Sequence, residues 1–298
     1  MTSPVPAPSA APAPPPLTSP TPDVLDLTIA IPVRNEERNL PGCLRALGSD
    51  LARHVVVIDS GSTDRTQEIA RAAGVEIVDF LWDGHFPKKR NWYLRHHQPA
   101  TKWVLFMDAD EHLTEDFKAE LRAALAHNDK VGYWLSYTVY FMGKQLRGGY
   151  PLRKLALFRV GAGEYERIEE DHWSRLDMEV HEHPVLTGET GVIRSKIDHQ
   201  DFRDMAHYVA KHNDYGSWEA ARFAKVDAAT AASFTWRQRL KYRLLRSVLF
   251  GPLYFGGSYL LMGGFRDGAR GLAFALLKMS YFTQIYCKIQ ENQAAQRR

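Results

Sequence analysis

Four short apolar runs constrain the fold of this chain most, because each is followed by polar or acidic residues and then by helical spacing. The runs cover residues 27–32, 54–59, 75–79 and 103–107. Runs of four to eight apolar residues that alternate with helical stretches are typical of buried strands joined by crossover helices. The sequence therefore predicts an α/β domain with a mostly parallel sheet, in which Gly74 ends the helix at 65–73.

The chain of 298 residues divides into three parts by composition. Residues 1–23 consist mostly of Pro, Ala, Ser and Thr, which cannot form a packed core, so a disordered tail is expected there. Residues 24–235 hold the α/β domain, with helices after 36 and 87, mixed strands and long loops over 131–201, and a helix over 202–223. Residues 236–298 form a separate helical region.

The region 236–298 is basic and rich in aromatic residues. It holds 11 lysines and arginines against Asp267 and Glu291, whereas the rest of the chain holds 27 against 33 acidic residues. A basic tail on an acidic body argues against nucleic-acid binding and favours attachment to an anionic membrane surface. The uncharged stretch 248–265 contains Pro252 and five glycines, which argues against a spanning helix. Two amphipathic helices lying in the membrane interface are predicted at 238–262 and 268–288; the alternative is a helical pair packed on the α/β body.

Cysteine content and the N-terminal sequence bear on the compartment. Cys43 and Cys287 are too few for a disulfide framework or a zinc site, and residues 1–23 lack the pattern of a secretory signal. A cytoplasmic location is expected.

Acidic residues follow two of the predicted strands, where ligands of parallel sheets bind. Asp108 and Asp110 come directly after the fourth strand, and such a pair can hold Mg²⁺ or Mn²⁺ together with substrate phosphates. Asp59 ends the second strand before Ser, Gly and Thr residues, so it can accept from a base or a ribose hydroxyl; Thr63 or Asp64 is then expected to cap the next helix.

A segment with three cationic residues, Lys-Lys-Arg-Asn, lies at 88–91, before the fourth strand. They can meet a diphosphate, or they can simply form the solvated start of a helix.

These segments together resemble family-2 glycosyltransferases, in particular the bacterial lipopolysaccharide-core and exopolysaccharide enzymes. The resemblance lies in Pro-Val-Arg-Asn-Glu-Glu at 32–37, Val-Val-Ile-Asp-Ser-Gly-Ser-Thr-Asp-Arg-Thr at 56–66, Lys-Arg-Asn at 89–91 and Met-Asp-Ala-Asp-Glu at 107–111. It is specific over residues 27–125 and looser over 130–220. It implies a GT-A fold, a nucleotide-sugar donor, a divalent metal and inversion at the anomeric carbon.

The resemblance also assigns roles to residues by position. Pro32, Arg34, Asn35 and Glu36 would border the nucleotide, Asp59 would contact the uracil, Arg90 the base or diphosphate, Asp108 the ribose beside the metal, and Asp110 the metal. His199, in an Ile-x-His element, would complete the metal shell or touch the diphosphate; a structural histidine is the alternative.

A general base for the acceptor hydroxyl is expected in residues 177–184. In an extended strand Glu179, His181 and His183 share one face and Glu182 the other, so spacing does not choose between Glu182 and Glu179, and His181 stays a third candidate. The resemblance to a Val-His-Glu element favours Glu182. A zinc site at His181 and His183 lacks a further ligand pair.

One segment departs from the family's pattern. Relatives tend to have Tyr-Pro followed by an acidic residue and then Arg-Leu-Phe, whereas this chain has Leu152 and Ala156 at those places, with Arg153, Lys154 and Arg159 as substitutes.

The expectation is therefore an inverting, metal-dependent glycosyltransferase (Mn²⁺ or Mg²⁺), peripheral on the cytoplasmic face of the bacterial inner membrane. It would move a sugar from a UDP-sugar to a lipid-linked or other saccharide acceptor in cell-envelope polysaccharide or lipopolysaccharide synthesis. The alternatives are a membrane-associated, non-catalytic nucleotide-sugar-binding or scaffold protein, and a phosphatase using the Asp-x-Asp pair. The phosphatase is disfavoured because His112 stands where such enzymes have Thr or Val.

Overall fold

A computed structural model describes residues 24–127, 129–168, 176–179, 183–200 and 203–297. The tail predicted at 1–23 and the base candidates His181 and Glu182 lie outside these residues.

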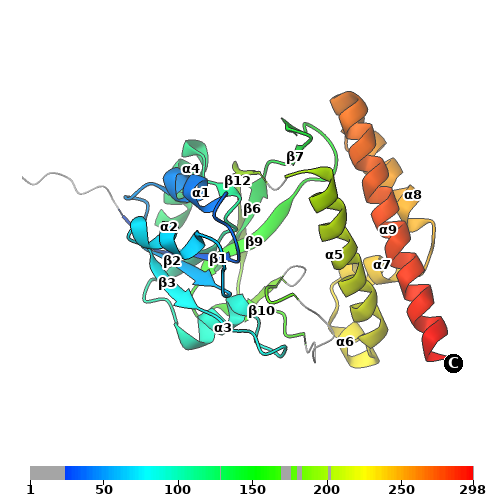
Figure 1. Ribbon diagram of the computed structural model, residues 1–298, viewed down its shortest axis with the longest axis horizontal. Coiled ribbons are helices and arrows are strands. Elements are labelled where there is room, and N and C mark those ends of the chain that lie inside the picture. The colour runs from blue at the N-terminus through cyan, green and yellow to red at the C-terminus, as the bar shows by residue number, and fades with distance from the viewer. Residues whose placement is uncertain (1–23, 128, 169–175, 180–182, 201–202, 298) are drawn as a thin grey trace, which may run out of the picture.

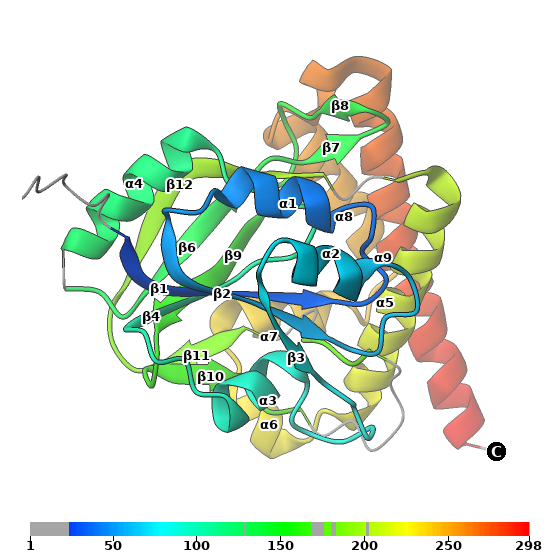
Figure 2. The ribbon, with the colours of Figure 1, turned by 60° about the vertical axis from the view of Figure 1, so that its left-hand side comes forward.

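An eight-stranded sheet forms the centre of the described structure, in the order β3-β2-β1-β4-β9-β6-β12-β5 (Figures 1 and 2). The strands are β1 (Leu25–Val33), β2 (Ala52–Asp59), β3 (Glu76–Asp79), β4 (Trp103–Phe106), β5 (Glu111–His112), β6 (Gly132–Tyr137), β9 (Arg153–Arg159) and β12 (Thr190–His199). The first four are mutually parallel, whereas β9 runs antiparallel to both β4 and β6. Two small two-stranded sheets pair β7 (Tyr140–Phe141) with β8 (Lys144–Gln145) and β10 (Gly163–Tyr165) with β11 (Pro184–Leu186). The predicted α/β class with a GT-A type of sheet is confirmed.

Helices cover both faces of the parallel half of the sheet, so its strands are apolar on both sides. On one face, α1 (Leu40–Leu47), α2 (Thr66–Ala72) and α4 (Glu115–Ala126) share one buried apolar cluster with Ile29 and Ile31 of β1. On the other face, α3 (Lys89–His96) packs on a cluster that includes Ala30. Burial on both faces explains why the parallel strands read as continuous apolar runs.

The first helix is shorter than the helical spacing from 36 to 51 predicts. It begins beside Pro41, which suits the first turn of a helix, and it ends before Gly48, whose φ is +75°. The end predicted at Gly74 is confirmed: its φ is +70° and its N–H donates to the carbonyl of Arg71.

The C-terminal region is helical, but the single helix predicted over 238–262 is wrong. The structure has α7 (Trp236–Leu244), α8 (Phe250–Phe255), a π-helical turn η1 (Gly256–Leu261) and a 3₁₀ turn η2 (Gly264–Asp267) before the long α9 (Gly268–Gln296). Pro252 lacks the N–H that a helix continuing from α7 requires, and Gly263, with φ +73°, turns the chain after η1.

Helix α5 (Met205–Lys225), whose start is capped by Asp204, packs along α9 and lies between it and the sheet (Figure 1). Ala220 of α5, Leu245, and Ile285 and Ile289 of α9 form a buried cluster. The short α6 (Ala228–Ser233) connects α5 to α7. Residues on both sides of the boundary predicted at 235 thus share one apolar core. In the described part of the chain, no helix combines the length and the apolar character needed to cross a membrane.

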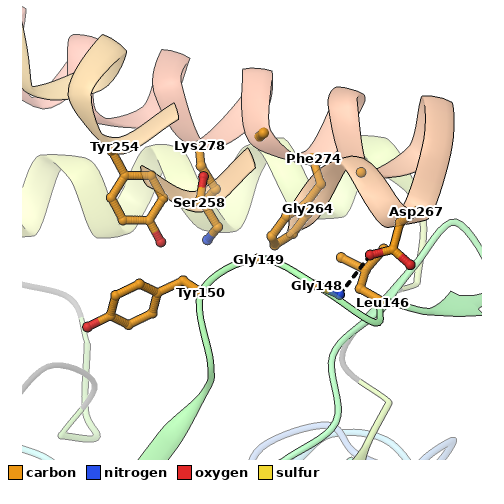
Figure 3. A pocket seen from close by; sticks show the side chains of 12 residues that line it. Leu146, Gly148, Gly149, Tyr150, Tyr254, Ser258, Gly264, Asp267, Phe274 and Lys278 are labelled. Carbon is orange, nitrogen blue, oxygen red and sulfur yellow. Dashed lines mark hydrogen bonds between the residues drawn. The ribbon is translucent and has the colours of Figure 1, made fainter. Parts of the chain in front are cut away.

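The loop before β9 is fastened to the C-terminal helices (Figure 3). The carboxylate of Asp267 accepts hydrogen bonds from the backbone N–H groups of Arg147, at 2.9 Å, and Gly148, at 2.9 Å. A Cβ at Gly148 would lie 2.0 Å from the carbonyl oxygen of Gly263, so only glycine permits this approach.

Candidate active site

A cavity of about 520 Å³ opens at the carboxyl ends of β1 and β4. Pro32 and Glu36 line it from the end of β1, and Asp108 and Asp110 line it from the end of β4. Other walls come from α3, β9, β12, α5 and α9, through Arg90, Lys154, His199, Tyr208, Lys211, His212, Lys278 and Tyr281. The two strand ends converge as parallel strands require.

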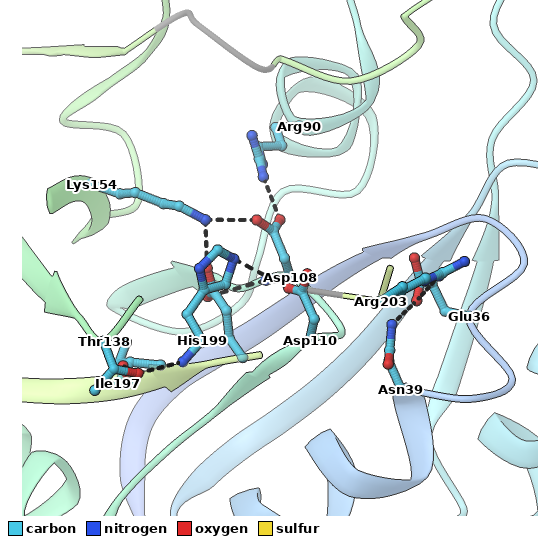
Figure 4. A network of polar contacts seen from close by, with 11 residues as sticks. Glu36, Asn39, Arg90, Asp108, Asp110, Thr138, Lys154, Ile197, His199 and Arg203 are labelled. Atoms are coloured by element: carbon cyan, nitrogen blue, oxygen red, sulfur yellow. Dashed lines mark hydrogen bonds and ion pairs between the residues drawn. The ribbon is translucent and has the colours of Figure 1, made fainter. Parts of the chain in front are cut away.

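Asp108 lies between two cations (Figure 4). Arg90 Nη2 is 2.8 Å from Oδ1 of Asp108, and Lys154 Nζ is 2.8 Å from Oδ2. Lys154 also reaches Oε1 of the buried Glu111 at 2.6 Å and lies over the ring of Tyr137. Both carboxylate oxygens of Asp108 are therefore engaged by side chains of this protein.

These contacts determine the charges at the strand end. Burial opposes ionisation of Asp108, but Lys154 and Arg90 outweigh it and hold the pKa of Asp108 well below its usual range. Burial raises the pKa of Glu111 to about 8, against the opposing effect of Lys154. Burial also disfavours the charged Lys154, yet Asp108 and Glu111 raise its pKa well above the usual value. Asp108 and Lys154 are thus a charged pair at neutral pH.

Asp110 and His199 form the second pair in the cavity, with Nε2 of His199 3.7 Å from Oδ1 of Asp110. Within the described residues no group of three or more His, Cys, Asp or Glu side chains is arranged to hold a metal. A carboxylate and an imidazole nevertheless fit Mn²⁺ or Mg²⁺ that takes its remaining ligands from a diphosphate and water. Among the described lining residues, Asp110 and His199 fit a metal ion, whereas both oxygens of Asp108 are paired with Arg90 and Lys154.

The loops after β1 and β2 are hydrogen-bonded to each other. Asn35, with φ +58°, accepts from the N–H of Thr63 at 2.8 Å, and Thr66 Oγ1 accepts from the N–H of Glu36 at 2.7 Å. Asp64 accepts from the N–H groups of Thr66 and Glu37, so it joins the start of α2 to the first loop. These hydrogen bonds between the two loops fix the position from which Glu36 reaches the cavity.

The residues predicted to contact the nucleotide do not all reach the cavity. Asp59 is fully buried, and its carboxylate accepts from Ser62 and from Gln67 Nε2, at 2.7 Å. Asp59, Arg34 and Asn35 lie beside the cavity and are not part of its lining, whereas Pro32, Glu36, Arg90 and Asp108 line it.

Of the three cations in residues 88–90, the structure brings one to the cavity. Lys88 and Lys89 are buried, so the start of α3 is not a solvated face. Lys89 Nζ donates to the carbonyl of Val33 at 3.1 Å and lies 3.3 Å from Asp177. Lys89 therefore anchors α3 to the end of β1, and Arg90 is the cation that faces Asp108.

Glu179 caps α3. Its two carboxylate oxygens accept from the backbone N–H groups of Arg90 and Asn91, both at 3.0 Å, and its backbone carbonyl accepts from the Arg90 guanidinium. The side chain is buried and lines the cavity. These bonds give Glu179 a structural role at the start of α3, whereas the sequence also allows it to be the general base.

The resemblance to the family places residues 211–215 of α5 at the mouth of the site, and the cavity lining bears this out, but the sequence does not predict the part of the wall that α9 forms. Lys154 was noted as a substitute cation, but its pairing with Asp108 depends on β9 lying beside β4, which no local pattern reveals. Lys278 lies in the helix predicted at 268–288, which the sequence assigns to the membrane interface, so the sequence does not place this lysine in the cavity. The sequence signal for Lys278 is that it is a charged residue on a helix face that is otherwise aromatic.

Residues 28–180 match the model of the family described as glycosyl transferase family 2, which covers just over half of the chain. The chain belongs to glycosyl transferase family 2. Family membership agrees with the order of the motifs at the ends of β1, β2 and β4.

Several curated proteins are similar to this family-2 chain over part of its length. A 4,4'-diaponeurosporenoate glycosyltransferase of Staphylococcus haemolyticus is 33% identical over 99 residues, which are 32% of this chain and 26% of that protein. A TPR repeat-containing protein of Synechococcus elongatus is 32% identical over 36% of this chain and 26% of its own length. A glycosyltransferase of Rickettsia typhi is 27% identical over 39% of each chain. This chain thus spans about a quarter to two fifths of these relatives.

Among solved structures, glucosyl-3-phosphoglycerate synthase of Mycobacterium tuberculosis with Mn²⁺, UDP and glucosyl-3-phosphoglycerate is 23% identical. The alignment covers 36% of this chain and 42% of that one, with a TM-score of 0.30. The same enzyme with phosphoglyceric acid is 22% identical over 39% of this chain and 44% of that one, with a TM-score of 0.31.

Proposed function

We propose that this protein is an inverting, metal-dependent glycosyltransferase that moves a sugar from a UDP-sugar to a lipid-linked saccharide acceptor of the bacterial cell envelope. The observation that carries the proposal is the pairing of Arg90 and Lys154 around Asp108, beside Asp110 and His199, in one cavity at the strand ends. Membership in family 2 supports glycosyl transfer as the reaction class.

The charges of the described side chains support donor binding. Arg90 and Lys154 bring positive charge to the strand end, where the diphosphate of a donor would lie, and Asp108 orients both cations. Asp110 and His199 would hold Mn²⁺ or Mg²⁺. When bound, the metal supplies charge neutralisation to the departing nucleoside diphosphate. The arrangement favours loss of an anionic leaving group, because its positive charges lie ready at the strand end before the reaction.

Inversion by direct displacement also requires a base for the acceptor hydroxyl. Glu179 is engaged by α3, which supports Glu182, three residues further along the chain, as the base. His181 remains the other candidate. In the displacement the acceptor oxygen bonds to the anomeric carbon, its proton passes to the base, and the bond to the diphosphate breaks.

Exposed apolar residues on the C-terminal helices support a lipid-linked acceptor and a peripheral place at the cytoplasmic face of the membrane. Leu260, Leu261, Met262 and Phe265, here called the apolar tip, are all exposed, and Leu261 is 88% exposed. Arg246 and Arg266 are exposed nearby in sequence. Apolar insertion combined with attraction to anionic headgroups gives reversible attachment to a membrane.

Thermal unfolding with UDP-, GDP-, CMP- and dTDP-sugars, each with and without Mn²⁺, tests donor binding. We expect a UDP-sugar to raise the melting temperature only when metal is present, since a ligand of the folded state stabilises it by mass action. Asp110→Asn should lose this shift, whereas Asp116→Asn, an exposed carboxylate on α4, should keep it. The absence of a shift with every donor would contradict the proposal.

Turnover separates the proposal from its alternatives. If the protein is an enzyme, it should transfer or hydrolyse the sugar of the donor that raises its melting temperature. Asp110→Asn should lose this activity. Binding without any turnover would favour the nucleotide-sugar-binding scaffold, and release of phosphate from a phosphomonoester would favour the phosphatase.

A further inference from the structure

The wall of the cavity opposite the strand ends has a chemistry of its own. The lining residues that α5 and α9 supply are Tyr208, Lys211, His212, Tyr215, Phe274, Lys278 and Tyr281. These are basic or aromatic, and no carboxylate stands among the lining residues described on these two helices. The acids that line the cavity, such as Asp108 and Asp110, come instead from the loops and strands of the α/β body.

Lys278 is at the centre of this wall. Its Nζ lies 2.8 Å from Nε2 of His212 and 5.5 to 5.9 Å from the ring centroids of Phe274, Tyr281 and Tyr208. The ring of Tyr208 stacks on His212 at 4.0 Å. Aromatic packing thus holds Lys278 and His212 together and partly buries both.

The surroundings of Lys278 differ from those of Lys154. Lys154 is balanced by Asp108 and Glu111 at 2.8 and 2.6 Å, whereas Lys278 meets an imidazole and aromatic faces. Lys278 therefore brings a half-buried positive charge to an aromatic part of the cavity lining, where an anionic ligand is favoured. Lys211 adds a further positive charge and lies close enough to lower the pKa of Glu36, which burial raises.

We propose that Lys278, held in place by Nε2 of His212 and supported by Lys211, binds a phosphate group of the acceptor. This inference rests on the proposed function, since it specifies the acceptor of the same cavity. A phosphate carries up to two negative charges and several acceptor oxygens, which suit two lysines. His212, whose Nδ1 donates to the carbonyl of Tyr208 and whose Nε2 accepts from Lys278, orients the Lys278 ammonium. Tyr208 and Tyr281 then offer flat apolar faces to the carbon skeleton next to that phosphate.

The placement of Lys278 indicates where the rest of the acceptor lies. Lys278, Tyr150, Tyr254 and Phe274 also line a second, small cavity that reaches Ser258 and Gly264. Figure 3 shows Lys278 pointing from α9 towards the loop of Gly149 and Tyr150. In the sequence Ser258 lies two residues before the apolar tip and Gly264 lies within it, so the small cavity joins Lys278 to the turns that carry the tip.

Calorimetric titration with defined probes tests the proposal. The probes are octyl phosphate against octanol, and glucose 6-phosphate against glucose, each titrated with and without saturating UDP and Mn²⁺. A phosphate probe should bind more tightly than its partner without phosphate, in the presence of UDP as well. Lys278→Met should weaken that binding by about 10-fold or more, the loss expected for one charge-assisted hydrogen bond.

Two variants control for structure and for charge. Lys278→Arg keeps the cation and should retain most of the binding. Lys225→Met removes an exposed lysine at the end of α5 and should bind like the unaltered protein. Preference for octyl phosphate assigns the site to a lipid phosphate, and preference for glucose 6-phosphate assigns it to a sugar phosphate; both support the proposal.

Three results would overturn it: equal binding of probes with and without phosphate, unchanged binding in Lys278→Met, or complete displacement of the phosphate probe by UDP. Complete displacement by UDP would show that Lys278 binds the diphosphate of the donor. A failure of the proposed function is seen separately, as absence of donor binding and turnover in a protein that still binds the phosphate probe through Lys278.

Discussion

At the scale of single residues, the position of Lys154 explains how two acidic side chains coexist at the end of β4. Glu111 is 1% exposed, and Lys154 is the cation that contacts both it and Asp108. Removing one member of a buried charged group leaves its partners without compensation, which costs more than the group contributes when it is intact.

We therefore predict that Lys154→Met lowers the free energy of unfolding by about 2 kcal/mol. Urea denaturation measures the change. Lys144→Met, in the exposed hairpin of β7 and β8, should change it by less than about 0.5 kcal/mol. Identical denaturation midpoints for the two variants would show that Lys154 does not stabilise the strand end.

The two glutamates near α3 should separate stability from chemistry. Glu179→Gln weakens the cap of α3, so we expect a loss of about 1 kcal/mol in stability. Glu182→Gln is expected to lower kcat by about 10²-fold or more, as loss of a general base does, without a comparable loss of stability. Unfolding curves and transfer rates of both variants check this. A fall in kcat confined to Glu179→Gln would reverse the assignment of the base.

The sequence predicted the parts of the site that follow strand ends. Pro32 ends an apolar run, and Glu36, Asp108 and Asp110 follow such runs; parallel strands bring their ends together without further information. Lys154 and Lys278 could not be placed, because each reaches the cavity through packing between segments distant in sequence. The buried state of Lys89 was likewise hidden, since its partner Asp177 is 88 residues away.

At the scale of elements, α4 is tied to an irregular part of β12. The register of β12 against β6 shifts between Ile193 and Lys196, and Glu120 of α4 accepts from the backbone N–H groups of Arg194 and Ser195, at 2.9 and 2.7 Å. The helix therefore satisfies the backbone donors at the bulge, where pairing with β6 is interrupted.

This contact makes stability depend on pH. Burial opposes ionisation of Glu120, but the hydrogen bonds from Arg194 and Ser195 together prevail and lower its pKa below the usual 4.5. The stabilisation is present above pH 4.5 and is lost as the pH falls through the folded-state pKa. We predict that Glu120→Gln costs about 1 kcal/mol at pH 7 and progressively less below pH 4.5.

Denaturant titrations from pH 7 to pH 3 measure this difference. Glu115→Gln is the control, because its side chain is 87% exposed. A cost of Glu120→Gln that stays constant over the whole range would exclude the charge of Glu120 as its source.

The elements themselves were predictable to different degrees. Strands β1 to β4 and helices α2 and α5 were anticipated because apolar spacing and capping residues agree there. The helix predicted over 238–262 failed because apolar spacing continues through residues 245–249, where the chain leaves the helix, and Pro252, which has no N–H, lies in the first turn of the next helix, α8. The short strands β7, β8, β10 and β11 carry too few residues for a periodic pattern.

At the scale of the whole molecule, the C-terminal helices serve two surfaces. They complete the cavity with Phe274, Lys278 and Tyr281, and they expose the apolar tip to solvent. Figure 1 shows α5 between α9 and the sheet, so the helical layer is part of the folded body.

We predict that Leu261→Asp reduces co-sedimentation with vesicles containing anionic phospholipid by about 10-fold, since it replaces an inserted apolar group with a charge. Leu81→Asp is a matched control: Leu81 is 86% exposed and lies after β3, away from the tip. Binding should also weaken with salt, because part of it is electrostatic. Equal losses for the two variants, or none, would remove the apolar tip as the membrane contact.

The hydrogen-bonded contact between Asp267 and the loop at Arg147 and Gly148 constrains how this protein can evolve. The two segments lie about 120 residues apart in the chain, yet the backbone of one leaves no room for a side chain on the other. An insertion in either segment would separate the carboxylate from its two N–H groups. We therefore expect the two segments to have changed together, so that homologues with a longer loop before β9 also carry an altered turn before α9.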